Sequence, residues 1–519
     1  TSFILKQYWL GQLIMFGFYQ IGGFYGLIVF RCLVYAGIGL ILYYWMRKEG
    51  INRLTALIFL MPSAYLSNCF LGERPNNLSF LFAVIVVYLL ENPPIPPLVK
   101  GGKGGLLKLI ALPLVMLLWA NMHGGFLLGD AIIFLYIFSG GLKFFYMKIK
   151  HRPQSAFQTS DYGLNTFFIV CLSSIFISFI NPNSYRVIPT LLELEGTYYS
   201  ASIMEMASPL KFAGNVKYQL LILIGSIGLF FLLKIRQMKF NLILLITFLV
   251  VLALTRLRYI PFLLYISTPF IACLWMNSFD LLTRKLERFH ALFWVVLAFA
   301  VFLISSNIRG TVLKLPSHIT FYPDASVEFI KKEKPEGRIF NEYEWGGYLI
   351  WKLYPEYRVF IDGRSLVQST FSTYKTALSG SVKSINGVPE WKAILNSHGV
   401  NAVIVSGISV SGENFPRLLR RLVDDKDWEL VFIDQRALIF IKDTDNNREI
   451  IRKYSKPKVL AYGKALEVAE FYRTTRPDDW KVYTTLGEIN LYLGSPKIAL
   501  LNFEYAFRIN PSLQSTSFG

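Results

Sequence analysis

Long apolar runs occupy most of the first 309 residues of the chain, and short polar or basic segments separate them. A helix needs about 20 apolar residues to cross the hydrocarbon core of a bilayer, and fewer where neighbouring helices shield it. The pattern predicts about ten transmembrane helices, near residues 24–46, 54–70, 78–90, 106–121, 125–146, 165–181, 218–235, 240–255, 258–276 and 290–306. Residues 4–19 carry one apolar stripe, which predicts an interfacial helix. Residues 1–309 are therefore expected to form an all-α membrane domain.

Basic residues gather in every second loop between these runs. Because cytoplasmic loops carry an excess of Lys and Arg, the basic loops are predicted to lie in the cytoplasm. They are 47–53, 91–105, 143–152, 234–239 and 284–288. Alternation places the remaining loops on the outer side, together with everything after Arg309: they are 71–77, 121–125, 181–217 and 255–258.

After Arg309 the pattern changes to short strands and amphipathic helices, which predicts a small α/β domain over 310–445. Strands are expected at 338–341, 357–361, 401–405, 428–433 and 437–442, and helices at 324–333, 389–398 and 414–424. If the first two strands are parallel, the polar residues after each meet at one edge, where α/β sheets bind ligands. These residues are Asn341, Glu342 and Glu344, and Asp362, Gly363 and Arg364. Ordinary turn-forming loops remain the alternative.

Residues 446–519 have a helical pattern with an internal repeat. Pro477 and Pro511 are 34 residues apart, and Ala465 and Ala499 repeat that interval. This spacing matches the tetratricopeptide repeat, in which small residues let paired helices approach and a proline ends the second helix. Since three or more repeats are usually needed for stability, we expect a truncated array or one that packs on the α/β domain. Such a tail is a possible binding site for a protein partner.

Composition agrees with a membrane protein: 53% of the residues are hydrophobic and 17% are charged, against about 25% charged in soluble domains. The formal net charge is +19, but the basic residues lie between apolar runs and form no arginine-rich arm. This indicates contact with anionic membrane lipids and no nucleic-acid partner. The four cysteines lie far apart in apolar runs, so neither a disulfide framework nor a metal site is expected. Because the chain opens with Thr1 and residues 1–23 carry no signal peptide, an N-terminal piece is expected to precede it.

Polar residues at the predicted outer ends of the spans are the candidate functional residues. The stretch WANMHGGFLLGD, residues 119–130, places polar groups between two apolar runs. Ionisable groups at this depth are costly and usually line a bundle interior or a wet cavity. The residues predicted to gather on this side are Glu73, Arg74, Asn121, His123, Asp130, Asn181, Asn183, Arg186, Glu193, Glu195, Arg256 and Arg258. Alternatively, each charged group extends singly to the lipid headgroups, and His123 is a turn histidine bonded to a backbone carbonyl.

Several segments together resemble bacterial multi-spanning proteins related to the GT-C glycosyltransferases, which use lipid-phosphate-linked sugars. They are RPNNLSFLF (74–82), WANMHGGFLLG (119–129), NPNSYR (181–186), RLRYIPF (256–262), NEYEWGGYLIW (341–351) and VFIDGR (359–364). The resemblance covers most of 1–445. It implies a hexosyltransferase of a bacterial inner membrane that moves a sugar from a polyprenyl-phosphate donor to an acceptor at the outer face. No cofactor can be identified.

A transferase of this kind needs cations for the donor phosphate and a carboxylate or histidine to deprotonate the acceptor. We expect Glu73, His123 or Asp130 to act in catalysis, His123 as a general base or as a cation for the phosphate, with its tautomer fixed by Asn121. The residues expected to bind substrate are Arg74, Asn121, Asn183, Arg186, Arg256, Arg258, Trp345, Asp362 and Arg364. Members of this superfamily place a carboxylate in the first outer loop, and no such loop occurs here, which leaves the base open.

Two other functions remain. An O-antigen ligase or polymerase also has about ten spans and an outer loop with arginines and histidine, but that loop lies between late spans. Here the predicted outer domain follows the last span. A non-enzymatic membrane scaffold with a tetratricopeptide tail is the third candidate, and it needs no buried charges.

Overall fold

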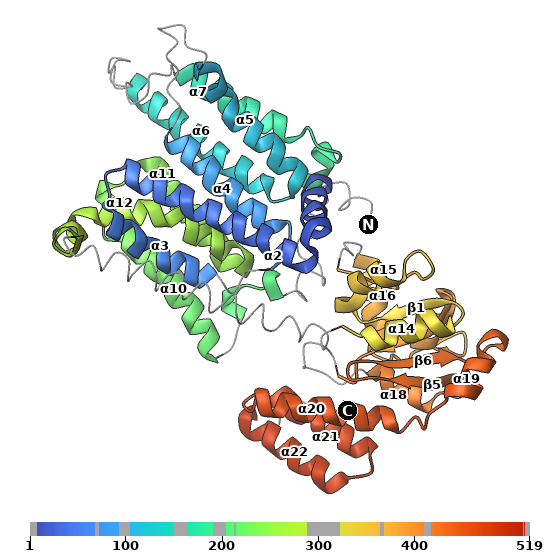
Figure 1. Ribbon diagram of the computed structural model, residues 1–519. Coiled ribbons are helices and arrows are strands. Elements are labelled where there is room, and N and C mark those ends of the chain that lie inside the picture. Colours follow the sequence, from blue (N-terminus) through green and yellow to red (C-terminus); the bar gives the residue numbers. More distant parts are fainter. Residues whose placement is uncertain are drawn as a thin grey trace. The chain divides into compact units, whose positions relative to one another are not determined.

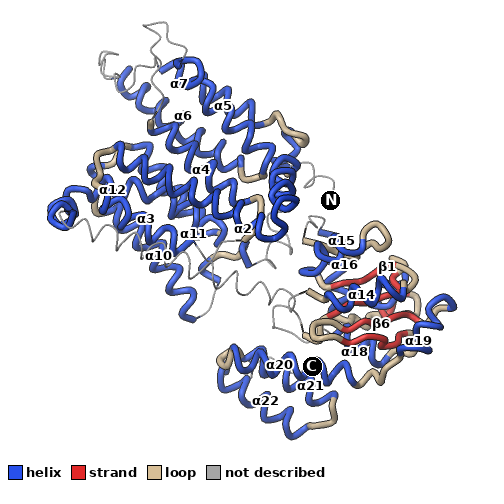
Figure 2. The backbone as a smooth tube through the Cα atoms, in the orientation of Figure 1, coloured by secondary structure: helices blue, strands red, loops and turns tan. Residues whose placement is uncertain are grey.

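The computed structural model describes residues 8–67, 72–92, 104–149, 164–189, 204–211, 214–287, 322–363, 368–408, 417–511 and 513. The chain divides into two compact units, 1–308 and 309–519 (Figure 1). The ranges expected to form an α/β domain and a helical tail, 310–445 and 446–519, both lie in the second unit. Helices predominate among the described residues, and every strand described there belongs to the second unit (Figure 2).

The first unit is a bundle of apolar helices around α4. Ten residues of α4 are buried, and this helix contacts α2, α5, α6 and α12. The long helices are α2 (Trp9–Lys48), α3 (Arg53–Ser67), α4 (Asn76–Glu91), α5 (Gly104–Met122), α6 (Phe126–Ile149), α7 (Leu164–Ser178), α10 (Gly214–Leu232), α11 (Phe240–Thr255) and α12 (Ile260–Glu287). Short 3₁₀ turns lie between them: η4 (Ser184–Arg186), η5 (Met204–Met206), η6 (Pro209–Lys211), η7 (Ile235–Gln237) and η8 (Leu257–Tyr259).

Three helices in the described part are long and apolar enough to cross a membrane, which is fewer than the ten expected. They cover Trp9–Lys48, Phe126–Tyr146 and Leu257–Met276, and six shorter apolar helices of 10–17 residues accompany them. For α4 the difference follows from helix length, because its 16 residues rise only about 24 Å, against a hydrocarbon core of about 30 Å. The expected span at 290–306 lies outside the described residues.

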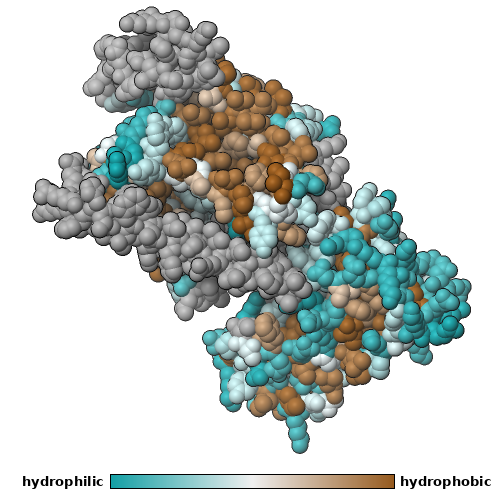
Figure 3. All heavy atoms as spheres, in the orientation of Figure 1, coloured by the Kyte–Doolittle hydropathy of each residue, from teal (hydrophilic) through white to brown (hydrophobic). Residues whose placement is uncertain are grey.

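The outer surface of the first unit is apolar. Hydrophobic side chains cover much of the described part of this unit's face seen in Figure 3, and many large ones, such as Ile21, Leu40 and Phe176, are exposed. Soluble proteins rarely expose apolar patches beyond a few hundred Å². With the three long apolar helices, this surface fits a protein that inserts into a membrane.

Helix α2 is two helices joined at a kink. Gly22 and Gly23 have non-helical backbone angles, and Gly23 has φ +56°, a conformation that favours glycine. The second part begins close to residue 24, where the first span was predicted. The placement of the first part at a membrane interface stays a prediction.

The second unit contains the predicted small sheet. Its strand order is β1-β4-β6-β5, with β1 parallel to β4 and β6 antiparallel to both its neighbours. The strands are β1 (Arg338–Asn341), β4 (Val400–Val405), β5 (Trp428–Ile433) and β6 (Leu438–Lys442), and β2 (Ser384–Ile385) pairs with β3 (Val388–Pro389). The expected strand at 357–361 is reduced to a single parallel bridge between Ile339 and Val359. Helices α14 (Asp324–Glu333), α15 (Gly346–Leu353), α16 (Gln368–Leu378), α17 (Glu390–Ser397), α18 (Arg417–Asp424) and α19 (Arg448–Tyr454), with turns η10 (Tyr343–Trp345) and η11 (Asp445–Asn447), complete it.

Three consecutive helices form the end of the described chain. They are α20 (Leu460–Thr475), α21 (Trp480–Tyr492) and α22 (Pro496–Ile509). Gly487 of α21 lies directly on the ring of Phe503 in α22, where a Cβ atom would be 2.4 Å from the ring. The tail packs on the α/β part, since Gly407 lies against Ala465 and Arg420 donates to the Tyr492 hydroxyl. The helical pattern is therefore confirmed, and its classification as a tetratricopeptide repeat stays a prediction.

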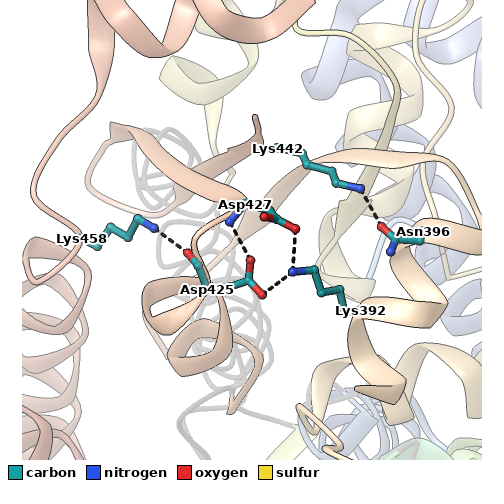
Figure 4. Close-up of polar contacts among 6 residues, drawn as sticks. All are labelled: Lys392, Asn396, Asp425, Asp427, Lys442 and Lys458. Atoms are coloured by element: carbon teal, nitrogen blue, oxygen red, sulfur yellow. Dashed lines mark hydrogen bonds and ion pairs between the residues drawn. The ribbon is translucent and has the colours of Figure 1, made fainter. Parts of the chain in front are cut away.

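An ion-pair network ties the start of this tail to the sheet (Figure 4). Lys392 of α17 lies 2.7 Å from a carboxylate oxygen of both Asp425 and Asp427. Lys458, just before α20, donates to the backbone carbonyl of Asp425 at 2.7 Å. The loop between α18 and β5 is thereby held from both sides.

Candidate functional site

Loops from distant parts of the sequence meet at one end of the first unit. We call this the polar end and define it as residues 72–79, 119–130, 178–186, 205–208 and 256–259. Three contacts connect its parts: the Asn121 side chain donates to the Ile180 carbonyl at 2.8 Å, the Leu257 amide donates to the Ala207 carbonyl at 3.0 Å, and Arg74 pairs with Glu205. The predicted site residues of the first unit thus lie at one end of the bundle.

His123 lies between α5 and α6, and the hydrogen-bond partners of its Nδ1 atom define the state of the ring. The Gly125 amide donates to Nδ1 at 3.0 Å, and the Ser79 hydroxyl lies 2.7 Å from the same atom. Because an amide N–H can only donate, Nδ1 is an acceptor and the neutral ring carries its proton on Nε2. The Ser79 hydroxyl in turn accepts from the buried Trp119 Nε1 at 2.8 Å.

Burial, together with the smaller effect of the nearby Arg258 charge, lowers the pKa of His123 to about 4. The imidazole is therefore neutral at physiological pH. A neutral ring whose Nδ1 is occupied offers the Nε2–H as a hydrogen-bond donor. This arrangement favours a donor role over the expected roles as a cation for phosphate or as a general base.

Asn121 does not fix the His123 tautomer, which was the expectation. Its amide nitrogen donates to the carbonyls of Leu117 and Ile180 at 2.9 and 2.8 Å, and its oxygen accepts from Trp9 Nε1 at 3.0 Å. The Asn121 amide group is therefore bonded to other parts of the bundle and not to His123. Asn121 joins the ends of α2, α5 and α7, and so positions the His123 loop.

The two glycines after His123 have different roles. A Cβ atom on Gly125 would lie 2.5 Å from Ser79 Oγ and 2.9 Å from His123 Nδ1, whereas Gly124 has only ordinary contacts, with Tyr8. Neither glycine has a positive φ. The close approach predicted for this pair is therefore present at Gly125, and it lets the backbone reach the imidazole.

Asp130 lies in α6, just over one turn from its start. Its Oδ2 atom accepts from the Ser178 hydroxyl at 2.9 Å. Its Oδ1 atom is buried and has no hydrogen-bond partner among the residues that the structure describes. An orphaned buried acceptor costs free energy, about 1–3 kcal/mol, and a catalytic role is one explanation for such an atom.

Glu73 is held by an arginine that the sequence reasoning missed. Arg31 of α2 lies 2.6 Å from Glu73, and its side chain is only 6% exposed. The signal was visible, because Arg31 is a lone charge inside the apolar run 24–46. Because Glu73 is paired with Arg31, its carboxylate is less available as a base than that of Asp130, whose Oδ1 atom has no partner among the described residues. Asp130 is therefore the better candidate for the general base.

The remaining predicted residues of the first unit also lie at the polar end. Arg258 donates to the hydroxyl of Tyr259 at 3.2 Å and lies over its ring. Arg186 is exposed, Arg256 is half-buried where the chain turns from α11 to α12, and Asn183 is buried. The polar end therefore contains four arginines, and Arg31 lies beside it, paired with Glu73. The predicted Glu193 and Glu195 lie outside the described residues.

In the second unit, three parallel segments end at the same edge of the sheet. Glu342 follows β1 and its Oε1 accepts from the amide and hydroxyl of Ser406, which follows β4, at 3.2 and 2.9 Å. The side chain of Asn341 donates to the Ile361 carbonyl at 2.9 Å and accepts from the Phe360 amide at 3.0 Å. The Asn341 side chain therefore bonds to the backbone directly before Asp362, which brings the two predicted groups of polar residues to the same edge of the sheet, whereas the partner of Glu342 is Ser406.

The predicted binding residues of the second unit divide into buried and undescribed ones. Trp345 and Asp362 are buried, and the Nε1 atom of Trp345 has no hydrogen-bond partner among the described residues. Arg364 lies outside the described residues. Gly346 lies against the Ile361 carbonyl, where a Cβ atom would be only 2.2 Å away. Gly346 therefore also permits a close backbone approach, whereas no atom lies within 4 Å of the Cβ position of Gly347.

Burial raises the pKa of Glu342 to about 7, although the hydrogen bond from Ser406 acts in the opposite direction. A raised carboxyl pKa stabilises the fold at low pH, and this contribution is lost as the pH rises through about 7. We expect the second unit to be more stable at pH 5 than at pH 8 by about 2 kcal/mol, measured by thermal unfolding of the full chain.

The Glu342→Gln variant should lose most of this pH dependence. Glu344→Gln is the matched control, because Glu344 is exposed two residues away. An unchanged pH profile in Glu342→Gln would show that the buried carboxyl does not titrate in this range.

Within the described residues, no three His, Cys, Asp or Glu side chains lie close enough to hold a metal ion. No family model matches the chain, and no curated protein matches it. The residues that can be assigned a chemical role are those of the polar end: arginines for an anion, a neutral histidine as donor and an aspartate with a spare oxygen.

Proposed function

We propose that the protein is an integral membrane glycosyltransferase of GT-C type. It transfers a sugar from a polyprenyl-phosphate donor to an acceptor at the outer face of a bacterial inner membrane. The observation that carries this proposal is the meeting of His123, Asp130 and the arginines at one end of an apolar bundle. A polyprenyl donor has its tail in lipid and its phosphate at the surface, so both halves of the molecule have a suitable environment there.

The charge of the polar end supports an anionic donor. Four arginines face three acids, and two of these acids, Glu73 and Glu205, are already paired with Arg31 and Arg74. A charge-assisted hydrogen bond to phosphate contributes about 1.5–3 kcal/mol. In this proposal Arg256, Arg258 and Arg186 bind the phosphate.

Asp130 is the proposed base. Its Oδ1 takes the proton of the acceptor hydroxyl, and the acceptor oxygen attacks the anomeric carbon. The bond from that carbon to the phosphate oxygen breaks, and its electron pair leaves with the polyprenyl phosphate. The Nε2–H of His123 donates to an oxygen on which negative charge develops, in the manner of an oxyanion donor.

The basic loops between the helices support a placement of the polar end outside the cytoplasm. The second unit then lies on the same outer side, and its helical tail is a candidate site for a protein partner. Trp345 and Asp362 are buried, which supports a role in shaping the 341–363 loops rather than in direct contact with the sugar.

A transfer assay tests this function. The protein is reconstituted in proteoliposomes with a radiolabelled polyprenyl-phosphate hexose, and release of label from the lipid is measured. We expect transfer by the native chain and a loss of about 100-fold or more in Asp130→Asn. A scaffold would release no label, and an O-antigen ligase would use only a diphosphate-linked glycan; either result would reject the proposal.

A further inference from the structure

The buried arginine of α2 is the least expected charge in the first unit. Arg31 lies in the longest apolar helix, within an 18-residue window that has a mean hydropathy of 2.0. An ionisable residue at membrane depth is costly and usually belongs to a functional site. The sequence resemblance assigns no role to this position, and the transfer step above does not use it.

Arg31 and its partner Glu73 meet through a single contact and differ in how far they are exposed. One Arg31 nitrogen lies 2.6 Å from one Glu73 oxygen, and the side chains are 6% and 34% exposed. Among the residues that the structure describes, no other side chain pairs with the Arg31 guanidinium group. Since a guanidinium carries five N–H donors, this single contact leaves most of its capacity unused.

The surroundings suit an anion. Tyr35, one turn after Arg31, donates to Asn77 at 3.2 Å, and Asn77 donates to the Gly72 carbonyl at 2.6 Å. These bonds hold the segment before α4 next to Arg31. Helix α4 begins at Asn76, three residues after Glu73, and the positive end of a helix dipole favours an anion near its start. In the structure, the anion beside Arg31 is a carboxylate oxygen of Glu73.

We propose that Arg31 is an anion-binding residue of the polar end, and that a phosphate group displaces Glu73 from it. The partly exposed carboxylate neutralises the buried arginine until the ligand arrives. This inference deepens the proposed function, because the donor phosphate is the ligand that the transferase would bring. Its test, however, measures binding and requires no transfer.

Removing each partner gives opposite results under this proposal. Glu73→Gln removes the competing anion, so it should tighten phosphate binding about tenfold. Arg31→Gln removes the cation and should weaken binding about tenfold or more. A purely structural ion pair predicts that both variants lower stability and change binding in the same direction.

The test uses the full chain in lipid nanodiscs, with dodecyl phosphate and inorganic phosphate as probes, and reads dissociation constants by titration calorimetry. Glu91→Gln is the matched control, because Glu91 is a mostly buried carboxylate at the far end of α4, paired with Lys239. It should bind as the native chain does. If Arg31→Gln fails to fold, Arg31→Gln with Glu73→Gln leaves no unpaired charge and should bind weakly.

Opposite shifts with dodecyl phosphate alone identify a lipid headgroup as the ligand, and opposite shifts with both probes identify the phosphate itself. Parallel shifts, no shift in Glu73→Gln, or no binding of either probe to the native chain and Glu73→Gln would overturn the inference. Opposite shifts without sugar transfer would retain it and reject the transferase. Sugar transfer together with parallel shifts would retain the transferase and reject the role of Arg31 in anion binding.

Discussion

Replacing His123 with alanine is expected to lower the rate of sugar transfer by about 100-fold or more. The substitution removes the Nε2–H donor, and loss of one such donor costs about 10² to 10³ in rate. It also leaves the Ser79 hydroxyl and the Gly125 amide without their acceptor, so the rate is normalised to folded protein. His398→Ala is the control, because His398 lies in the second unit. A variant rate above about a tenth of the native rate would make His123 structural.

The pH profile separates a donor from a base. Because burial lowers the pKa of His123 to about 4, the ring stays neutral from pH 5 to 8 and contributes no inflection there. A general base with an ordinary pKa near 6.5 would make the rate rise through that pH. A rise of this kind that disappears in His123→Ala would contradict the donor role.

Gly346→Ala is expected to destabilise the second unit by about 3 kcal/mol. A Cβ atom there would lie 2.2 Å from the Ile361 carbonyl oxygen and 2.5 Å from Asp362 Cα, and these backbone atoms cannot rotate away. Gly347→Ala is the matched control, because no atom lies within 4 Å of its Cβ position. Alanine is also the better helix former, so this variant should be neutral or slightly stabilising.

The stability of both variants is measured by thermal unfolding of the full chain, with protease resistance of the second unit as the readout. Equal melting temperatures for Gly346→Ala and Gly347→Ala would show that the contact with residues 361 and 362 is not tight in solution.

The sheet of the second unit was largely predictable. The β-branched and apolar runs of β1, β4, β5 and β6 identified these strands, and the polar residues after β1 pointed to the edge where Glu342 meets Ser406. The segment 357–361 has the same composition but forms only one bridge, at Val359. Its pairing depends on a partner strand, which local sequence does not encode.

The membrane part was predictable in type but not in count. Apolar composition identifies a buried or lipid-facing helix, whereas crossing a bilayer depends on where the helix starts and ends. The bend in α2 depends on the backbone angles of Gly22 and Gly23, which hydropathy does not report.

The residue types of the candidate site were predicted from the sequence, but the hydrogen bonds and ion pairs that join them were not. His123 stood out as a histidine between apolar runs, but its partner Ser79 is 44 residues away and has no distinguishing pattern. Arg31 was detectable as an isolated charge, yet its pairing with Glu73 required the packing of α2 beside the start of α4. Asn121 was assigned to the imidazole because it is close in sequence, and the fold directs it to Ile180 instead.

The most direct measurement for the central claim is photo-crosslinking with a photoreactive polyprenyl phosphate. The probe is incorporated with the protein into liposomes and irradiated, and adducts are located by mass spectrometry of peptides. We expect adducts in residues 119–130 and 256–259 of the polar end, reduced by excess unlabelled polyprenyl phosphate. Adducts confined to the opposite end of the bundle, around Glu91 and Lys239, or adducts that resist competition would contradict the account.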